Sequence, residues 1–497
     1  MTRLTRRELF AAAGLAAAGL AVGGSHATAQ PPPTQAALAD LTRTLRGSVI
    51  GPDGGRFTEL ATPRNLRFAA TMPRAVVLCA DADDVAKTVL WARNTGTSFA
   101  IRGGGHNYAE ASSSRGVIIS TRQMTAATID GATLRAHAGV RNADLAALLP
   151  QGGGGRLLLP GGNCPGVGVV GLTLGGGIGP NAPWAGLTAD RLRKVTMVTA
   201  HGDVVTASPT ENPDLFWGLR GGAGGNFGVV TDLEYELVEV PVRRATTAEL
   251  SVTGADAATR VALAFQQLRA DAERIVTGNL YLGHAAGDVE AALTTQLLVD
   301  EADARDLLAP LTAIPGLTAE ITEQPWWGAY AWYVTPPSPA YPFWDRSLYA
   351  DQFLSGDALA AALEVVRRFP AGNDPERYGA MGLYGWVGGA VNDVAPDATA
   401  YVHRTARILV EMSSGWSPAP SGAPVAPIPP DIRDWEDELW ETVLPHTTGR
   451  SYQNFPDPEL ADWPRAYYGA NLDRLTRVKA TWDPEDVFRY PQGIPPR

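Results

Sequence analysis

Two reactive side chains of this sequence stand in glycine-rich segments. His106 follows three glycines in residues 102–108, and Cys164 lies in residues 161–166, which read GGNCPG. Consecutive backbone N–H groups of such segments form concave anion sites, so both are suited to hold a pyrophosphate. An imidazole and a thiol beside that site can also bond covalently to the bound group. The pattern predicts a phosphate-bearing cofactor; the structural alternatives are a loop histidine bonded to backbone and a Cys79–Cys164 disulfide.

Other common cofactor and catalytic motifs are absent or out of context. Residues 166–171 read GVGVVG and Asp190 follows roughly 20 residues later, as in a Rossmann fingerprint. However, Pro165 precedes the motif and three more glycines, 175–177, stand where its helix should begin. The chain has no Gly-Lys pair and no G-x-S-x-G, which excludes a P-loop and argues against a serine hydrolase. Its seven histidines and two cysteines lack metal-ligand spacing, so we expect no metal site.

Length and composition limit the class of protein. The 497 residues correspond to two or three domains at about 150 residues each. Hydrophobic residues make up 45% and charged residues 19%, which is typical of a globular chain and not of a disordered or multi-span membrane protein. The net charge of −11 offers no basic surface for a phosphate backbone. We therefore expect no nucleic-acid partner and no stable membrane association.

The reactive loops need elements to position them. Residues 75–80 are predicted to form a buried strand, 81–96 an amphipathic helix, and 98–101 a second strand that leads directly into the 102–108 loop. Loops at the carboxyl ends of such strands commonly carry chemistry. Further strands are predicted at 116–120, 128–138 and, as a hairpin, 195–207.

The first thirty residues resemble an export signal. Arg6 and Arg7 precede a short apolar stretch that ends at Gly24, and small residues at 27–29 form a cleavage site. The paired arginines match a twin-arginine signal, so we expect residues 1–29 to engage the Tat export machinery and the protein to be periplasmic or extracellular. An amphipathic or membrane-anchoring helix is the alternative.

Five ordered segments resemble motifs of the berberine bridge enzyme-like family of FAD-linked oxidoreductases, within the vanillyl-alcohol oxidase fold class. The segments are 102–108, 161–179, 214–222, 226–231 and a C-terminal pair at 467–475 and 491–495. The resemblance implies an α+β fold, in which a PCMH-type FAD-binding domain of two α+β subdomains is completed by the C-terminal segment. The inserted substrate domain is expected to be an antiparallel sheet with helices. The implied boundaries are 36–241 for FAD binding, 242–449 for substrate binding and 450–497 for the C-terminal segment.

The resemblance also implies the cofactor and its ligands. In this family a histidine of an R-x-G-G-H motif and a cysteine of a G-x-C-x-x-V-G motif often attach FAD twice, and here they are His106 and Cys164. Val167 resembles the small residue that admits oxygen in oxidases, with ordinary packing as the alternative. The other cofactor-binding residues implied are Arg102, Gly103, Gly104, Gly105, Asn107, Gly161, Gly168, Gly171, Gly228, Val230, Tyr468 and Asn471.

For catalysis, residues 451–457 resemble the family's Y-x-N-Y-x-D segment, whose first tyrosine takes the proton of a substrate hydroxyl. Tyr452 is therefore the expected base, although a phenol with an unperturbed pKa of about 10 needs help from its neighbours. Phe455 replaces the second tyrosine of the segment, which puts one hydrogen bond in doubt.

Three further residues are expected at the catalytic site. Residues 388–393 resemble the strand that carries a glutamate base in plant members, and Asn392 is the first of the three residues. Because this segment has Asn392 and Asp393 and no glutamate, a plant-type carboxylate base is in doubt; Asp393 is the alternative carboxylate for that role. Tyr108 and Tyr384 are expected to line the pocket, with a structural role as the alternative for each.

The resemblance implies an exported oxidase with bicovalent FAD. Such an enzyme would oxidise a small-molecule alcohol, namely a sugar, an oligosaccharide or a glycosylated secondary metabolite, and reduce O2 to H2O2. Two alternatives stay open, a dehydrogenase of the same fold that uses another electron acceptor and a flavin-bearing binding protein.

Overall fold

A parallel strand-helix-strand unit carries the loop that contains His106. The computed structural model describes residues 33–418 and 427–497, so the predicted export signal at 1–29 lies outside the described residues. Strands β2 (Ala75–Leu78) and β3 (Phe99–Arg102) run parallel to β4 (Val117–Ser120), and β1 (Ser48–Ile50) completes a sheet of order β1-β2-β4-β3.

Helix α4 (Ala82–Thr95) connects β2 to β3, as the sequence predicts. The side chain of Asp81 accepts a hydrogen bond from the Asp84 N–H at the first turn, and Gly96 ends the helix at a φ of 64°, where glycine is favoured. Helix α2 (Gln35–Thr44) packs against α4. The unit thus delivers the chain to the 102–108 loop at the carboxyl end of β3.

A second, antiparallel sheet has the order β5-β6-β10-β8-β9. The predicted strand at 128–138 is in fact a hairpin, because Gly131 adopts a φ of 57° and turns the chain between β5 (Ala127–Asp130) and β6 (Thr133–His137). The other strands are β8 (Leu192–Val198), β9 (Val204–Ala207) and β10 (Val229–Glu236), and β8 and β9 form the predicted hairpin. Helices α5 (Asn142–Leu148) and α6 (Val169–Leu174) flank the Cys164 loop.

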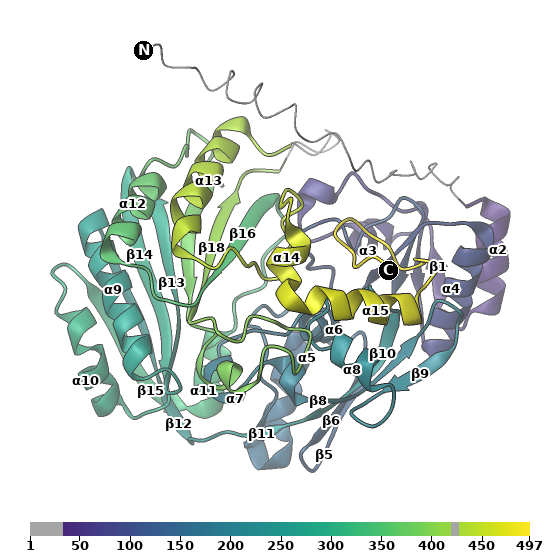
Figure 1. Ribbon diagram of the computed structural model, residues 1–497, viewed down its shortest axis with the longest axis horizontal. Coiled ribbons are helices and arrows are strands. Elements are labelled where there is room, and N and C mark those ends of the chain that lie inside the picture. Colours follow the sequence, from purple (N-terminus) through teal and green to yellow (C-terminus); the bar gives the residue numbers. More distant parts are fainter. Residues whose placement is uncertain (1–32, 419–426) are drawn as a thin grey trace. The chain divides into compact units, whose positions relative to one another are not determined.

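The third sheet has seven antiparallel strands in the order β15-β12-β14-β13-β17-β18-β16. Figure 1 shows its outer face covered by α9 (Ala255–Asp271), α10 (Glu301–Thr312), α12 (Gly356–Arg367) and α13 (Pro430–Val443). The apolar stripes of these helices and the sheet face beneath them form one large hydrophobic core. The strands are β12 (Arg244–Thr253), β13 (Val276–Ala285), β14 (Asp288–Leu297), β15 (Thr318–Pro325), β16 (Phe343–Ala350), β17 (Tyr378–Tyr384) and β18 (Ile408–Gly415).

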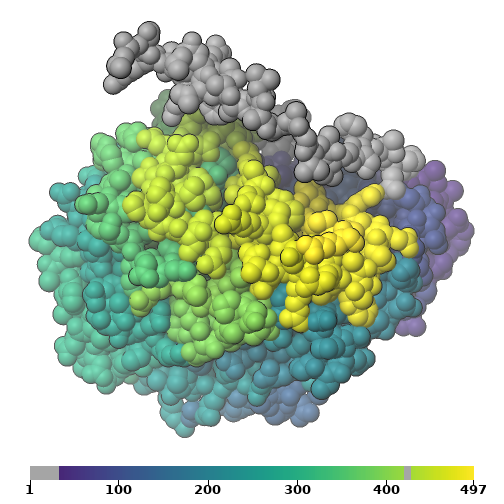
Figure 2. Space-filling model, viewed as in Figure 1, coloured from purple at the N-terminus to yellow at the C-terminus, as the bar shows by residue number. Residues whose placement is uncertain are grey.

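The C-terminal segment returns to the glycine-rich half of the chain. It contains α14 (Trp463–Tyr468), η7 (Gly469–Asn471) and α15 (Leu472–Trp482), drawn in yellow in Figures 1 and 2. The fully buried Lys479 donates to Asp483 at 2.7 Å and to the carbonyl of Asn226 at 2.9 Å. These bonds tie the segment to the loop before β10.

The described residues, 33–418 and 427–497, group into one compact unit, so the boundaries 36–241, 242–449 and 450–497 stay predictions. No helix of the described ranges is long and apolar enough to cross a membrane.

The shorter elements are α3 (Phe57–Ala61), η1 (Leu66–Phe68), η2 (Leu149–Gln151), η3 (Gly153–Gly155), β7 (Leu157–Leu158), α7 (Ala182–Ala185), η4 (Thr188–Arg191), α8 (Pro213–Gly218), β11 (Val238–Glu239), α11 (Trp326–Tyr333), η5 (Gly389–Asp393) and η6 (Leu444–His446).

Candidate active site

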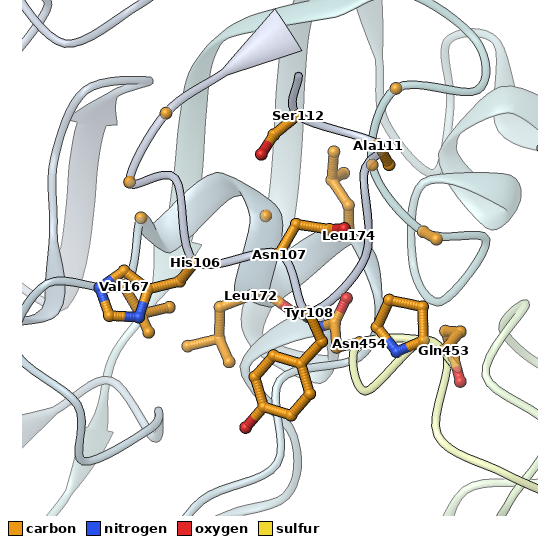
Figure 3. Close-up of a pocket in the computed structure, with 18 of the residues that line it drawn as sticks. His106, Asn107, Tyr108, Ala111, Ser112, Val167, Leu172, Leu174, Gln453 and Asn454 are labelled. Atoms are coloured by element: carbon orange, nitrogen blue, oxygen red, sulfur yellow. Dashed lines mark hydrogen bonds between the residues drawn. The ribbon is translucent and has the colours of Figure 1, made fainter. Parts of the chain in front are cut away.

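A cavity of ≈ 430 Å³ opens at the carboxyl end of β3. The loop after β3, the Cys164 loop and the C-terminal segment line most of it, and β13 and β17 contribute Asn279 and Tyr384. Figure 3 shows His106 and Val167 on one side and Gln453 and Asn454 on the other, with Asn107 and Tyr108 between them. Ligand pockets commonly measure about 300–1,000 Å³, so this cavity is large enough to be a binding site.

Glycines bring the two reactive loops into contact. A Cβ on Gly104 would lie 2.4 Å from the backbone nitrogen of Gly168, and one on Gly166 would lie 2.5 Å from Nε2 of His106. Atoms at these distances overlap, so only glycine lets the loops pack this closely. The close approach places the His106 imidazole against the loop that carries Cys164.

Helix α5 holds the Cys164 loop in place. The Asn142 side-chain amide donates to the carbonyl oxygens of Gly162 and Cys164 at 3.1 and 3.0 Å, and its backbone N–H donates to the Val167 carbonyl at 3.0 Å. On the other side of the loop, the N–H of Thr335 donates to the Asn163 carbonyl at 3.2 Å. These bonds fix where the Cys164 thiol and the Val167 side chain lie.

The loop after β3 offers unused backbone donors to the cavity. Within the described ranges, no N–H group of residues 103–107 donates to a protein oxygen, and all five residues line the cavity. Gly105 adopts a φ of 75°, which turns the chain here. Successive free N–H groups in such a turn form an anion-binding concavity. The site thus fits a cofactor with a pyrophosphate.

The two candidate attachment residues are chemically available. Burial, together with the charges of Arg64 and Arg141, lowers the pKa of His106 to about 4, so its imidazole is neutral near pH 7 and has a free lone pair. Both cysteines are free thiols, so no disulfide joins Cys79 to Cys164, and desolvation raises the pKa of Cys164, which keeps its sulfur a protonated thiol near pH 7.

Twelve of the fifteen expected cofactor-binding residues line the cavity. They are Gly103, Gly104, Gly105, His106, Asn107, Cys164, Val167, Gly168, Gly171, Gly228, Val230 and Tyr468. Gly161 lines a small neighbouring cavity instead, and the Asn471 amide donates to the carbonyls of Pro396 and Thr399.

Arg102 has a structural environment. Its side chain is 5% exposed and donates to the carbonyls of Leu60, Ala61 and Ser112 at 2.7–2.9 Å and to the Ser113 hydroxyl at 3.1 Å. Burial lowers its pKa to about 10, which still leaves it charged at neutral pH. Arg102 therefore fastens the β3 loop to its neighbours and does not face the cavity.

Among the tyrosines that line the cavity, the three expected at the catalytic site each have a different setting. Tyr108 stacks on Phe455, with ring centres 4.8 Å apart and planes within 5°. The Tyr452 oxygen receives the N–H groups of Gly177 and Ile178 at 3.2 and 3.4 Å and the Asn454 amide at 3.1 Å. Burial raises the pKa of Tyr452, and these three donors oppose the rise.

Tyr384 is paired with a carboxyl group that sequence reasoning missed. Its hydroxyl donates to Oε2 of Glu411 at 2.5 Å, and Glu411 is 6% exposed. A single Glu within the apolar run Ile408–Met412 was the available signal, but the sequence does not tell which strand pairs with which. Asn279 and Trp386 also line the cavity unpredicted, and both keep a buried polar atom without a partner in the described part of the chain.

Asn392 lies outside the lining of the cavity. Its amide donates to the Ala406 carbonyl at 3.1 Å, and the adjacent Asp393 is exposed and pairs with Arg274. Neither side chain is placed to act as a base in this pocket. Across residues 33–418 and 427–497, no cluster of three His, Cys, Asp or Glu side chains could hold a metal ion.

Two family models match the chain. An "FAD binding domain" model covers residues 73–208, and a "Berberine and berberine like" model covers residues 451–495. These ranges contain the loops that carry His106 and Cys164 and the segment that carries Tyr452.

Relatives that match nearly the whole chain are also oxidoreductases. The chain is 32% identical over 464 residues to an uncharacterized FAD-linked oxidoreductase of Bacillus subtilis (strain 168), which covers 91% of this chain and 97% of the relative. It is 29% identical over 497 residues to a chitooligosaccharide oxidase of Gibberella zeae, with 95% and 97% covered. Glucooligosaccharide oxidase from Acremonium strictum, described with a 6-S-cysteinyl, 8α-N1-histidyl FAD, matches the structure with a TM-score of 0.78 at 25% identity, covering 93% of this chain and 99% of that one.

Proposed function

This chain belongs to the berberine bridge enzyme-like family of FAD-linked oxidoreductases, and on that premise we propose that it oxidises the hydroxyl group of a carbohydrate and passes the electrons to O2. One observation carries the proposal: His106 and Cys164 stand in adjoining loops on one cavity, the arrangement that a doubly attached flavin requires. The oligosaccharide oxidases among its relatives support the substrate class.

FAD, when bound, supplies a two-electron acceptor for hydride from the substrate carbon and returns the electrons to O2, which yields H2O2. The chain's own residues bind and orient it. The free N–H groups of residues 103–107 would hold the pyrophosphate, while His106 Nδ1 or Nε2 and Cys164 Sγ would form the two covalent bonds. Two attachments also suit a protein exported by the segment 1–29, because an exported protein cannot recruit a replacement flavin from the cytoplasm.

The substrate would lie between this site and the seven-stranded sheet. Asn279 and Trp386 reach the cavity from β13 and from just after β17, and offer a carbonyl oxygen and an indole N–H that have no partner among the described residues. A molecule with several hydroxyl groups satisfies both, since each hydroxyl donates and accepts. The proton of the reacting hydroxyl goes to a phenol of the pocket, and the candidates are Tyr452 and Tyr384.

Val167 favours oxygen as the electron acceptor. Its side chain lines the same cavity as His106, and both are drawn on the same side of it in Figure 3. A side chain this small leaves room for O2 to approach the cofactor. Peroxide release, and not use of another acceptor, is therefore the expected outcome of turnover.

The test is a screen of mono- and oligosaccharides with the purified protein in air, measuring flavin bleaching and H2O2 together. The proposal expects one H2O2 for each carbonyl formed. Bleaching without peroxide would replace the oxidase by a dehydrogenase of the same fold. A flavin that no carbohydrate or other alcohol reduces would overturn the proposal.

A further inference from the structure

The segment just before η1 binds the loop after β3 at two points. The backbone N–H of Arg64 donates to the Gly105 carbonyl at 3.0 Å. The Asn65 side-chain amide donates to the Tyr108 carbonyl at 2.8 Å. These two bonds flank His106 in the sequence, so they fix both ends of the stretch that presents its imidazole to the cavity. Arg64 therefore has a fixed position relative to the first attachment residue.

The Arg64 guanidinium holds a second segment, residues 335–341. It donates to the Ser338 carbonyl and hydroxyl, both at 2.7 Å, and to the Pro339 carbonyl, and it lies 4.9 Å from the centre of the Tyr341 ring. A guanidinium carries five N–H donors in one plane, so a single side chain can hold several acceptors at once. Arg64 thus ties this segment to the loop after β3.

The same segment holds the loop that carries Cys164. The backbone N–H and the hydroxyl of Thr335 both donate to the Asn163 carbonyl, at 3.2 and 3.4 Å. Thr335 and Cys164 line the cavity together. Arg64 is not among the described residues that line it, so it acts on a bound group only through its neighbours. One chain of contacts therefore runs through Arg64 from one attachment residue to the other.

Arg64 also places a positive charge near both attachment residues. Burial raises the pKa of Cys164, whereas the Thr335 side chain and the charge of Arg64 lower it. Arg64 thus favours the thiolate, which is the nucleophilic form of a cysteine. Because the Arg64 side chain is only half-buried, solvent weakens this effect. The other titratable groups whose charges couple to that of Cys164 are Glu411, Tyr108 and Tyr384.

We propose that Arg64 is a positioning residue for the covalent bond between Cys164 and FAD. The inference rests on the proposed function, because it presupposes a doubly attached flavin. In forming the bond, Cys164 loses its S–H proton, and the sulfur joins a ring carbon that gives up its hydrogen as a second proton. The two electrons released reduce O2, which takes both protons and becomes H2O2. Arg64 holds the sulfur at the ring edge, and its charge favours loss of the S–H proton.

A variant that lacks His106 isolates this bond. In His106→Ala, Cys164 is the one attachment residue left, so flavin kept in an acid precipitate reports the bond to Cys164. We expect His106→Ala to keep its flavin and His106→Ala/Arg64→Gln to lose most of it. Arg64→Lys in place of Arg64→Gln retains the charge and should restore part of the attachment. Cys164→Ala/Arg64→Gln should keep its flavin, because the bond to His106 does not need Arg64.

Arg141→Gln is the matched control. The charge of Arg141 lowers the pKa of His106, as that of Arg64 does, but within the described chain it is not among the groups that act on Cys164. In the His106→Ala background, Arg141→Gln should therefore leave the flavin attached. Peptide mass spectrometry of each variant locates the flavin on Cys164 directly, and Tm shows whether the variant is folded.

Thiol reactivity tests the effect of the charge without any flavin bond. In the flavin-free full chain, alkylation of Cys164 by iodoacetamide should be about 2–10-fold slower in Arg64→Gln near neutral pH, because less thiolate is present. The rise of the rate with pH should move to higher pH. Arg64→Lys should keep the wild-type rate. Cys79 is buried, and Cys164→Ala gives the background that it contributes.

Full flavin retention in His106→Ala/Arg64→Gln would overturn the proposal, and so would an unchanged alkylation rate in Arg64→Gln. Equal loss of flavin in the Arg141→Gln control would also overturn it, because the effect would then not be specific to Arg64. Wild-type protein without flavin on Cys164 would instead refute the double attachment that the proposed function assumes. The alkylation rates would still decide whether Arg64 acts on Cys164.

Discussion

Replacing glycines of the cavity one at a time separates packing from cofactor binding. A Cβ on Gly104 would lie 2.4 Å from the backbone nitrogen of Gly168 and 2.6 Å from the carbonyl of Gly166, so Gly104→Ala forces two backbone segments apart. Gly171 also lines the cavity, but a Cβ there meets no protein atom within 4 Å. Gly171→Ala therefore leaves the protein's own packing intact and fills space that we assign to FAD.

The expected sizes follow from these distances. Overpacking of this kind costs about 1–3 kcal/mol. For a chain of 497 residues the unfolding entropy is on the order of 1 kcal/mol/K, so Gly104→Ala should lower the Tm of the flavin-free protein by about 1–3 °C. Gly171→Ala should leave that Tm unchanged and lower the fraction of protein that carries FAD. Gly55→Ala, where the added Cβ also meets nothing, is the control for both measurements.

Calorimetry of flavin-free protein and the ratio of flavin to protein absorbance check these expectations. The reasoning fails if Gly104→Ala unfolds at the wild-type temperature with full FAD content. It also fails if Gly171→Ala loses stability as much as Gly104→Ala does, because the cavity would then be part of the protein's own packing.

Three further predictions concern other parts of the structure. Val167→Leu should slow peroxide release while leaving anaerobic flavin reduction by substrate unchanged, which stopped-flow absorbance distinguishes. Lys479→Ala should cost about 3–5 kcal/mol in the free energy of unfolding, since it leaves Asp483 buried without its partner; denaturant titration measures this. FAD attachment to His106 should be independent of pH well above its pKa of about 4 and fall as the pH drops through it, because a protonated imidazole has no free lone pair; flavin retained after mixing flavin-free protein with FAD reports this.

The glycine-rich loops and the unit that leads into them were predictable because their signals are local. The strand-helix-strand unit that ends at Arg102 shows a helix cap at Asp81 and a glycine stop at Gly96 in the sequence itself. The turn at Gly131 was missed although the sequence marks it: Asp130-Gly131 is a turn pair, and the inward-facing positions change from odd numbers before it to even numbers after it. Local signals therefore locate His106 and Cys164 in the sequence, but not the distance between them.

Glu411 shows where sequence reasoning stops. Its place behind Tyr384 depends on which strands pair, in what register, and on the empty position at Gly382. Arg102 is the opposite case: its motif predicts contact with the cofactor, but its side chain donates to the carbonyls of Leu60 and Ala61 and so holds the adjoining loop in place. Both outcomes are set by contacts between residues distant in the chain, which one sequence does not display.

Acid precipitation tests most directly whether His106 and Cys164 hold the flavin. Wild type, His106→Ala, Cys164→Ala and the double variant are precipitated, and the flavin in pellet and supernatant is measured. We expect the wild type and both single variants to keep yellow flavin in the pellet, and the double variant to release it. Flavin in the wild-type supernatant, or wild-type protein without flavin, would contradict double attachment and return both residues to structural roles.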